Sequence, residues 1–142
     1  MLSTKNEGHI MNNVESLEVQ ARSILAPIIN EPGAILYSTV STLVRGDYYF
    51  MGLNPGGTDG SSIATAIDDI QRRRECAYVE EWGGKRLYKP GMHPLQRNAA
   101  VLFEKLGTAI ANVCASNLIY TRSESEGSAA FAHAALCWQV HQ

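Results

Sequence analysis

The segment 48–57 constrains the fold of this chain more than any other, because it joins a short aromatic and apolar run to a glycine-rich turn. Its sequence is YYFMGLNPGG. The run 48–53 has no alternation of polar and apolar residues, which is typical of a strand covered on both faces, as in a parallel sheet. Within the turn 52–57, Asn54 carries the one polar side chain. We therefore predict a central strand that ends at the edge of a binding or catalytic site.

Other segments alternate between helical and extended patterns, which predicts an α/β protein with a parallel sheet. Apolar residues recur at helical spacing from residue 13 until 31–33, where proline and glycine oppose continuation. The second strand is predicted over 113–120, and we expect helices on both sides of a short sheet, in three layers. The remaining predicted elements are, in chain order, an extended segment 34–44, a helix 63–74, an irregular segment 75–92, a helix 94–107 and a helix 128–142.

The size and composition fit one globular domain. The chain has 142 residues, of which 45% are hydrophobic and 18% charged. Residues 1–12 show no periodicity, so we expect a flexible terminus there and a single domain over 13–142. The formal net charge is −2, so a contact with nucleic acid would have to come from a local basic patch.

The cysteines and the hydropathy pattern predict an intracellular protein without a metal or another cofactor. Cys76, Cys114 and Cys137 are far apart and form no CxxC pair, so neither a disulfide framework nor a metal site is expected. No apolar run approaches the length that spans a membrane, and the opening residues do not resemble a signal peptide. We expect a cytoplasmic location and no contact with a membrane.

The glycine turn excludes two common site types. A phosphate loop of the Walker type needs Lys followed by Ser or Thr, and a dinucleotide loop needs GxGxxG, and neither is present. A nucleophile elbow needs Ser or Cys at the position of Asn54. A carboxamide accepts from water and donates to a carbonyl, but it is no strong base. The turn is thus suited to positioning a water molecule or holding a polar heterocycle.

The motif Gly52-Leu53-Asn54-Pro55-Gly56 after an apolar strand resembles the first motif of the uracil-DNA glycosylase superfamily. The variant is similar to that of the mismatch-specific (G:U/G:T) branch. Further segments resemble uncharacterised bacterial members in the same order along the chain: Tyr37-Ser38, HPLQR at 93–97, SNLIYTRS at 116–123 and CWQVH at 137–141. The resemblance covers roughly residues 34–142, and it implies a uracil-DNA-glycosylase-like fold and DNA as partner.

The resemblance also implies roles for individual residues. Asn54 would hold the water that attacks the sugar, and Gly52, Leu53, Pro55 and Gly56 would surround the flipped base. The main chain at Gly56 and Gly57 would approach the flipped nucleotide, whose extraction costs a few kcal/mol.

Several of these residues, and others nearby, could have a purely structural role instead. Asn117 would read the base edge, or it closes the second strand in an Asx turn. Arg122 and Ser123 would face a DNA phosphate, or Arg122 is a solvent-facing cation. The triplet 72–74 is either a solvated helix end or a basic patch that faces phosphate. Trp82 and Tyr88 are candidates for stacking on the base, or they pack within their loop.

Members of the superfamily continue with two further parallel strands and a loop that grips DNA, so we expect this chain to be truncated at its C-terminus relative to them. The predicted function is hydrolysis of the N-glycosidic bond of a deaminated or mismatched base in DNA. The alternative is a truncated, non-catalytic domain that binds nucleotides or nucleic acid, with an exposed apolar sheet edge. A third reading is a small-molecule binder whose glycine turn holds an anion.

Overall fold

The strands lie in the middle of a mixed α/β structure, which confirms the predicted class. The computed structural model describes residues 4–57, 60–82, 87–125 and 130–142, with side chains from residue 13 onward. Strand β1 spans Tyr49–Gly52 and strand β2 spans Cys114–Asn117. They pair in parallel, with Tyr49 opposite Cys114 and Gly52 opposite Asn117. Both predicted strands are therefore present, and their carboxyl ends lie side by side.

The predicted extended segment 34–44 forms a third, irregular row of the sheet in its first half. Leu36 bridges Ser116 in antiparallel fashion, and the amide of Tyr37 donates to the carbonyl of Ala115 at 2.8 Å. This segment lies on the edge of β2 away from β1. The prediction that the run 48–53 is central was wrong, because within the described residues β1 pairs with β2 alone and Tyr49 is 46% exposed.

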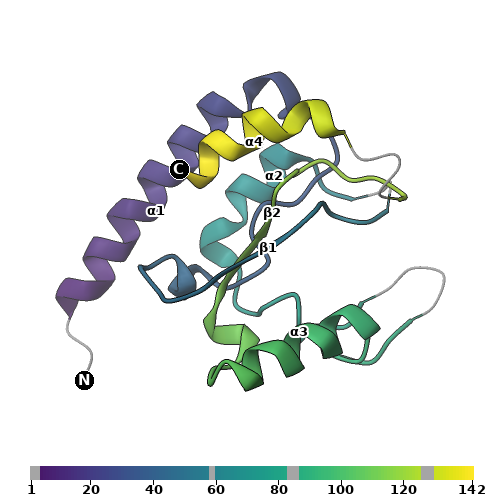
Figure 1. Cartoon of the computed structure of the whole chain (residues 1–142). Coiled ribbons are helices and arrows are strands. Elements are labelled where there is room, and N and C mark those ends of the chain that lie inside the picture. The colour runs from purple at the N-terminus through teal and green to yellow at the C-terminus, as the bar shows by residue number, and fades with distance from the viewer. Residues whose placement is uncertain (1–3, 58–59, 83–86, 126–129) are drawn as a thin grey trace.

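Helices lie on both sides of these strands (Figure 1). Helices α1 (Thr4–Ile24), α2 (Ile63–Asp68) and α4 (Ala134–His141) lie on one side, and α3 (Pro94–Lys105) lies on the other. Each side has its own buried cluster. The first packs α1, α2 and α4 around Tyr120, and the second packs α3 around Tyr78 and Phe103.

Helix α1 differs from its prediction at both ends. It begins at Thr4, so helix covers most of the terminus that we expected to be flexible. Adding residues to an existing helix costs far less than nucleating one, so a polar stretch can extend it without a buried face. At the other end, α1 stops at Ile24 and a 3-10 turn, Ala26–Ile28, follows with Pro27 in its first positions. Proline cannot donate the next helical hydrogen bond, so the helix ends before residues 31–33.

The two helices that flank the site begin as predicted. Ser62 caps α2 by accepting from the amide of Thr65 at 3.2 Å. The predicted helix 63–74 is shorter, however, because α2 ends at Asp68 and a 3-10 turn covers Ile70–Arg72. Helix α3 begins at Pro94 behind a capping box made by His93 and Gln96.

The chain segments between and after these helices largely follow expectation. The described part of 75–92 is irregular, with one antiparallel bridge between Trp82 and Tyr88. The last helical segment begins with a 3-10 turn, Phe131–His133, before α4. Two further 3-10 turns, Val40–Thr42 and Ile110–Asn112, precede β1 and β2.

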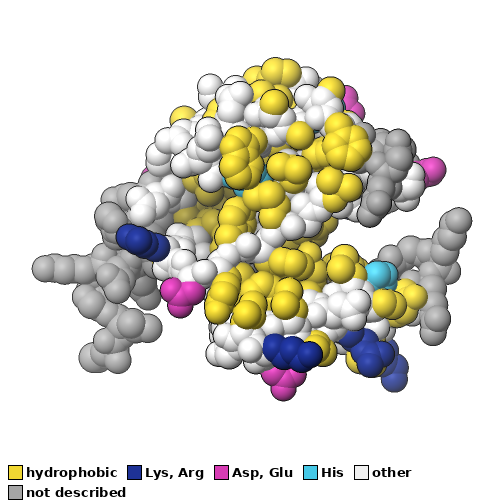
Figure 2. All heavy atoms as spheres, in the orientation of Figure 1, with side chains coloured by type: hydrophobic (Ala, Val, Ile, Leu, Met, Phe, Trp, Pro, Cys, Tyr) yellow, Lys and Arg dark blue, Asp and Glu magenta, His cyan; other side chains and the backbone are white. Residues whose placement is uncertain are grey.

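One face of the molecule carries hydrophobic side chains over α4, the strands and α3 (Figure 2). Tyr48 at 42%, Tyr49 at 46% and Trp138 at 46% are exposed. This agrees with the expectation of an exposed apolar sheet edge. Within the described residues, none of the helices combines the length and the apolar character needed to cross a lipid bilayer.

Candidate functional site at the strand ends

Two loops meet where β1 and β2 end. The turn after β1 and the segment after β2 are joined by a parallel bridge between Gly56 and Ser123. The amide of Ser123 donates to the carbonyl of Pro55 at 3.1 Å, and the amide of Ile119 donates to the carbonyl of Leu53 at 2.9 Å. The pairing of the two strands thus continues beyond their ends, which places residues far apart in the sequence at one location.

The Asn54 carboxamide is held between these loops. Its nitrogen Nδ2 donates to the Ser123 hydroxyl at 2.6 Å and to the Pro55 carbonyl at 2.9 Å. Ser123 is itself 7% exposed, and its hydroxyl donates to the carbonyl of Ser125 at 2.9 Å. Both hydrogens of Nδ2 are therefore occupied. Within the described residues the oxygen Oδ1 has no donor, so it is the group that can accept a hydrogen bond from water or a ligand.

Asn117 lies directly across from Gly52. A Cβ atom at position 52 would come within 2.5 Å of the Asn117 oxygen Oδ1, so the absence of a side chain there is what admits the carboxamide. Asn117 is 3% exposed, and its nitrogen Nδ2 makes no hydrogen bond of normal geometry among the described residues, although the Asn117 side chain is near enough to the Tyr37 phenol to lower the pKa of that phenol. A buried, unpaired amide nitrogen is uncommon in folded proteins and calls for a ligand or water as partner.

The pKa of the Tyr37 phenol responds to this carboxamide and to two arginines. Burial raises the pKa above its ordinary value, while the charge of Arg122, the Asn117 side chain and the charge of Arg73 lower it, in that order. Sequence reasoning did not select Tyr37 or Arg73 as site residues. The signals available were the place of Tyr37 in the segment resembling the superfamily and of Arg73 in the arginine triplet.

Arg122 is fixed to the glycine turn rather than free in solvent. Its Nη1 donates to the carbonyl of Gly56 at 2.9 Å, and its own amide donates to the carbonyl of Pro32 at 2.9 Å. Gly57 has a φ of 83°, in the region that favours glycine, and it is exposed beside this contact. All the predicted site residues therefore lie on the two loops or on the strand ends that lead into them. The structure brings them together without assigning them roles.

The aromatic candidates for base stacking are engaged elsewhere. The rings of Trp82 and Tyr88 lie 5.0 Å and 4.8 Å from that of His93, at the start of α3. Trp82 also contacts Tyr78 in the second core cluster. These contacts agree with the alternative that Trp82 and Tyr88 pack within their own part of the chain.

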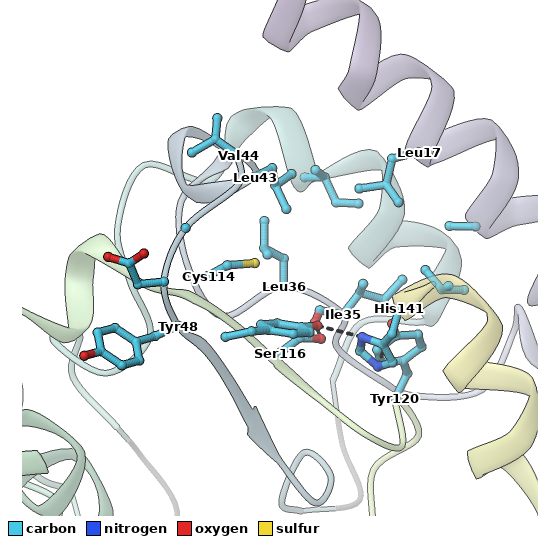
Figure 3. Close-up of a pocket in the computed structure, with 16 residues that line it drawn as sticks. Leu17, Ile35, Leu36, Leu43, Val44, Tyr48, Cys114, Ser116, Tyr120 and His141 are labelled. Atoms are coloured by element: carbon cyan, nitrogen blue, oxygen red, sulfur yellow. Dashed lines mark hydrogen bonds between the residues drawn. The ribbon is translucent and has the colours of Figure 1, made fainter. Parts of the chain in front are cut away.

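A separate, mainly apolar cavity of about 450 Å³ lies between α1, α4 and the strands (Figure 3). His141 forms its polar wall. Its Nε2 lies 2.9 Å from the Asn117 carbonyl, and its Nδ1 lies 2.6 Å from the Tyr49 hydroxyl. Because a carbonyl only accepts, Nε2 carries the proton and Nδ1 accepts from Tyr49. Asn54 does not line this cavity, so we do not place the chemistry of the glycine turn there.

The tyrosines and cysteines near the strands are poor acids and nucleophiles. Burial raises the pKa of Tyr49 to about 12, and it also raises the pKa of Tyr120. Burial likewise raises the pKa of the thiols of Cys76, Cys114 and Cys137, which are all free. A thiol with a raised pKa is mostly protonated at neutral pH and unreactive. Among the described residues, no group of three or more His, Cys, Asp or Glu side chains is placed to hold a metal.

No protein-family model, curated protein or solved structure matches this chain.

Proposed function

We propose that this protein is a DNA-glycosylase-like hydrolase that acts on the N-glycosidic bond of a deaminated or mismatched base of the uracil type. The observation that carries the proposal is the presence of one carboxamide at the carboxyl end of each of the two adjacent strands β1 and β2. Asn54 presents a free acceptor oxygen, and Asn117 presents a buried, unpaired amide nitrogen. The first has the chemistry to orient water, and the second has the chemistry to read a carbonyl on a base edge.

In the proposed reaction the bond between the sugar carbon and the base nitrogen breaks first, so the departing base takes the electron pair and the sugar becomes cationic. Water then adds to the cationic carbon, and the proton that this water loses passes to the departed base anion or to solvent. A weak acceptor is sufficient under these conditions, since the water need not be deprotonated before it attacks. The Asn54 oxygen would accept one hydrogen bond from that water. The hydrogen bonds from Nδ2 to Ser123 and Pro55 would keep Oδ1 aimed outward.

The superfamily resemblance adds independent support for DNA as the partner and for a uracil-DNA-glycosylase-like fold. The sheet arrangement is compatible with it, since two adjacent parallel strands carry the two asparagines at their carboxyl ends. In open α/β sheets, ligands bind beyond those ends. Gly56 and Gly57 lie there and are exposed, so a nucleotide backbone could approach the main chain.

The direct test is base release from oligonucleotides that contain uracil or xanthine, followed by alkaline cleavage at abasic sites. We expect the wild-type protein and Asn98→Ala to release the base, because Asn98 is exposed on α3 away from the turn. We expect Asn54→Ala to lose about hundredfold or more of the rate, the size typical of a positioned group that assists proton transfer. Equal release by all three proteins, or release by none of them, would remove the catalytic claim.

A second candidate function is binding of nucleotides or nucleic acid without hydrolysis. The buried amide nitrogen of Asn117 supports it, because that group can bind a base edge without any reaction. Fluorescence anisotropy with the same oligonucleotides separates the two functions. Tight binding of uracil-containing DNA with no base release would establish the binding function in place of the catalytic one.

A further inference from the structure

A second cavity, of about 530 Å³, opens between α2, the segment 33–36 and Arg122. It shares Ile35, Leu36 and Ile70 with the apolar cavity beside α1, and it adds charged groups to this apolar lining. Four arginines line it, namely Arg72, Arg73, Arg74 and Arg122, against three carboxylates, those of Asp69, Glu75 and Glu80. We refer to it as the arginine cavity.

The arginines of this cavity are only partly neutralised. Arg73 pairs with Glu80 at 2.9 Å, and Arg72 pairs weakly with Asp69 at 3.4 Å on the surface. Arg74 and Arg122 donate instead to backbone carbonyls, those of Gln71 and Gly56. A carbonyl satisfies a hydrogen bond but does not cancel a charge. Among the described residues, Arg74, Arg122 and the Glu75 carboxylate therefore have no ion-pair partner, and the lining carries one net positive charge.

Two donors of these arginines are also buried and unpaired. The Nε atoms of Arg73 and Arg122 are both inaccessible, and neither has a partner within the described residues. Gly60 allows this burial of Arg122, because a Cβ at position 60 would lie 2.7 Å from its Nε. Leaving a buried charged donor unsatisfied is strongly unfavourable, so such groups are normally matched by an acceptor.

The acceptor that suits the arginine side chains lining the cavity is an oxyanion. A guanidinium presents its Nε and Nη donors as a planar fork that matches two oxygens of a phosphate or carboxylate. Arg73 follows α2 and Arg122 follows β2, and both line the cavity. A phosphate bound there would compensate the excess of four arginines over three carboxylates.

We propose that the arginine cavity is a binding site for a phosphate group. The proposal goes beyond base release, since it requires neither Asn54 nor hydrolysis. The cavity contains both the triplet 72–74 and Arg122, which the sequence analysis treated as separate candidates for phosphate contact. The phosphate can come from a free ion or mononucleotide, or from the backbone of nucleic acid, and the experiment distinguishes these sources.

The test measures the affinity of the full chain for inorganic phosphate, a 5′-mononucleotide and a single-stranded oligonucleotide by calorimetry at constant ionic strength. We expect saturable binding that weakens about tenfold or more in Arg122→Gln and in the double variant Arg73→Gln with Glu80→Gln. The double variant removes both members of the ion pair, so it leaves no unpaired carboxylate. Arg97→Gln, on the exposed side of α3, should bind like the wild type.

Arg74→Gln gives a second measurement that does not depend on buried groups, because Arg74 is exposed at the cavity. It should fold normally and bind severalfold more weakly. Binding of phosphate and the mononucleotide assigns the free ligands. Binding of the oligonucleotide alone, with the same losses in the variants, assigns the nucleic-acid backbone. The proposal is overturned if none of the three probes binds, or if the variants bind as tightly as Arg97→Gln.

Asn54→Ala separates this proposal from the proposed function. It should abolish base release and leave phosphate affinity unchanged, since Asn54 does not line the arginine cavity. A wild-type protein that binds phosphate but releases no base would retain the phosphate site and remove the catalytic function. A protein that releases base but binds no phosphate would do the reverse.

Discussion

Gly52 sets the position of the Asn117 carboxamide, and through it the shape of the candidate site. The two residues are opposite one another in the parallel register. Any side chain at position 52 would begin with a Cβ atom 2.5 Å from the Asn117 oxygen, closer than two unbonded atoms can approach. Asn117 is almost fully buried, so it has little room to move aside.

Gly52→Ala should therefore destabilise the fold by about 1–3 kcal/mol, as overpacking in a close-packed interior does. It should also disturb the site by displacing Asn117. Gly56→Ala is the matched control, since a Cβ there meets no atom within 4 Å. It should change stability by no more than about 0.5 kcal/mol. Urea unfolding of the three proteins measures both effects, and equal midpoints for the two variants would contradict the account.

The placement of Asn54 and Asn117 at neighbouring strand ends could be predicted at this scale, whereas the placement of Arg73 in one cavity with Arg122 could not. The carboxyl ends of adjacent parallel strands lie together, so polar residues at those ends are expected to be neighbours. Arg73 lines the cavity of Arg122 where α2 has ended at Asp68 and a 3-10 turn redirects the chain. That break has no proline or glycine to mark it in the sequence.

Helix α3 shows how an element can be predicted correctly while its buried face is not. Its start at Pro94 was predicted. Helical spacing puts Leu95, Leu102 and Leu106 on one apolar face with Ala99 and Phe103, but the three leucines are 48%, 46% and 42% exposed. Ala99 and Phe103 are buried, together with Gln96. Gln96 is buried because it joins α3 to the preceding loop, donating to the carbonyls of Ala77 and Glu80 at 2.9 and 2.8 Å. Periodicity alone cannot anticipate a buried glutamine that is satisfied by a distant loop.

Gln96→Ala should destabilise the protein by about 2–3 kcal/mol, because it leaves buried carbonyls unpaired and also removes the cap on the His93 amide. The Gln96 oxygen accepts from that amide at 3.0 Å. Arg97→Ala, one position along and exposed, should be nearly neutral. Guanidinium unfolding monitored by tryptophan fluorescence would show the difference. A midpoint for Gln96→Ala equal to that of Arg97→Ala would mean that the loop is held by other contacts.

At the scale of the whole molecule, His141 connects α4 to both strands. It bridges the Tyr49 hydroxyl, the Tyr120 hydroxyl and the Asn117 carbonyl. Burial lowers the pKa of His141 below its ordinary value of 6.5, partly offset by the hydrogen bond to Asn117. The folded state therefore favours the neutral imidazole, and the unfolded chain takes up a proton more readily.

Because the unfolded chain binds this proton more readily, the stability of the folded protein should decrease as the pH falls. The contribution of His141 to stability is fully present above pH 6.5 and is lost as the pH falls from 6.5 toward the lower folded-state pKa. The slope stays below the one-proton limit of about 1.4 kcal/mol per pH unit, because the side chain is only partly buried. Thermal unfolding from about pH 8 to pH 5 should show a steeper loss for wild type than for His141→Gln. Parallel curves for the two proteins would contradict this assignment.

Asn54 and Asn117 are proposed to act on one bound nucleotide, and single-turnover release of uracil measures this directly. At saturating protein, Asn54→Ala should lower the rate constant about hundredfold or more while the half-saturating concentration stays constant. Asn117→Ala should raise the half-saturating concentration about tenfold or more, because it removes a hydrogen bond to the base. Asn98→Ala should match the wild type in both quantities. Wild-type rates and half-saturation in both the Asn54 and Asn117 variants, or no uracil release by the wild type, would contradict the account.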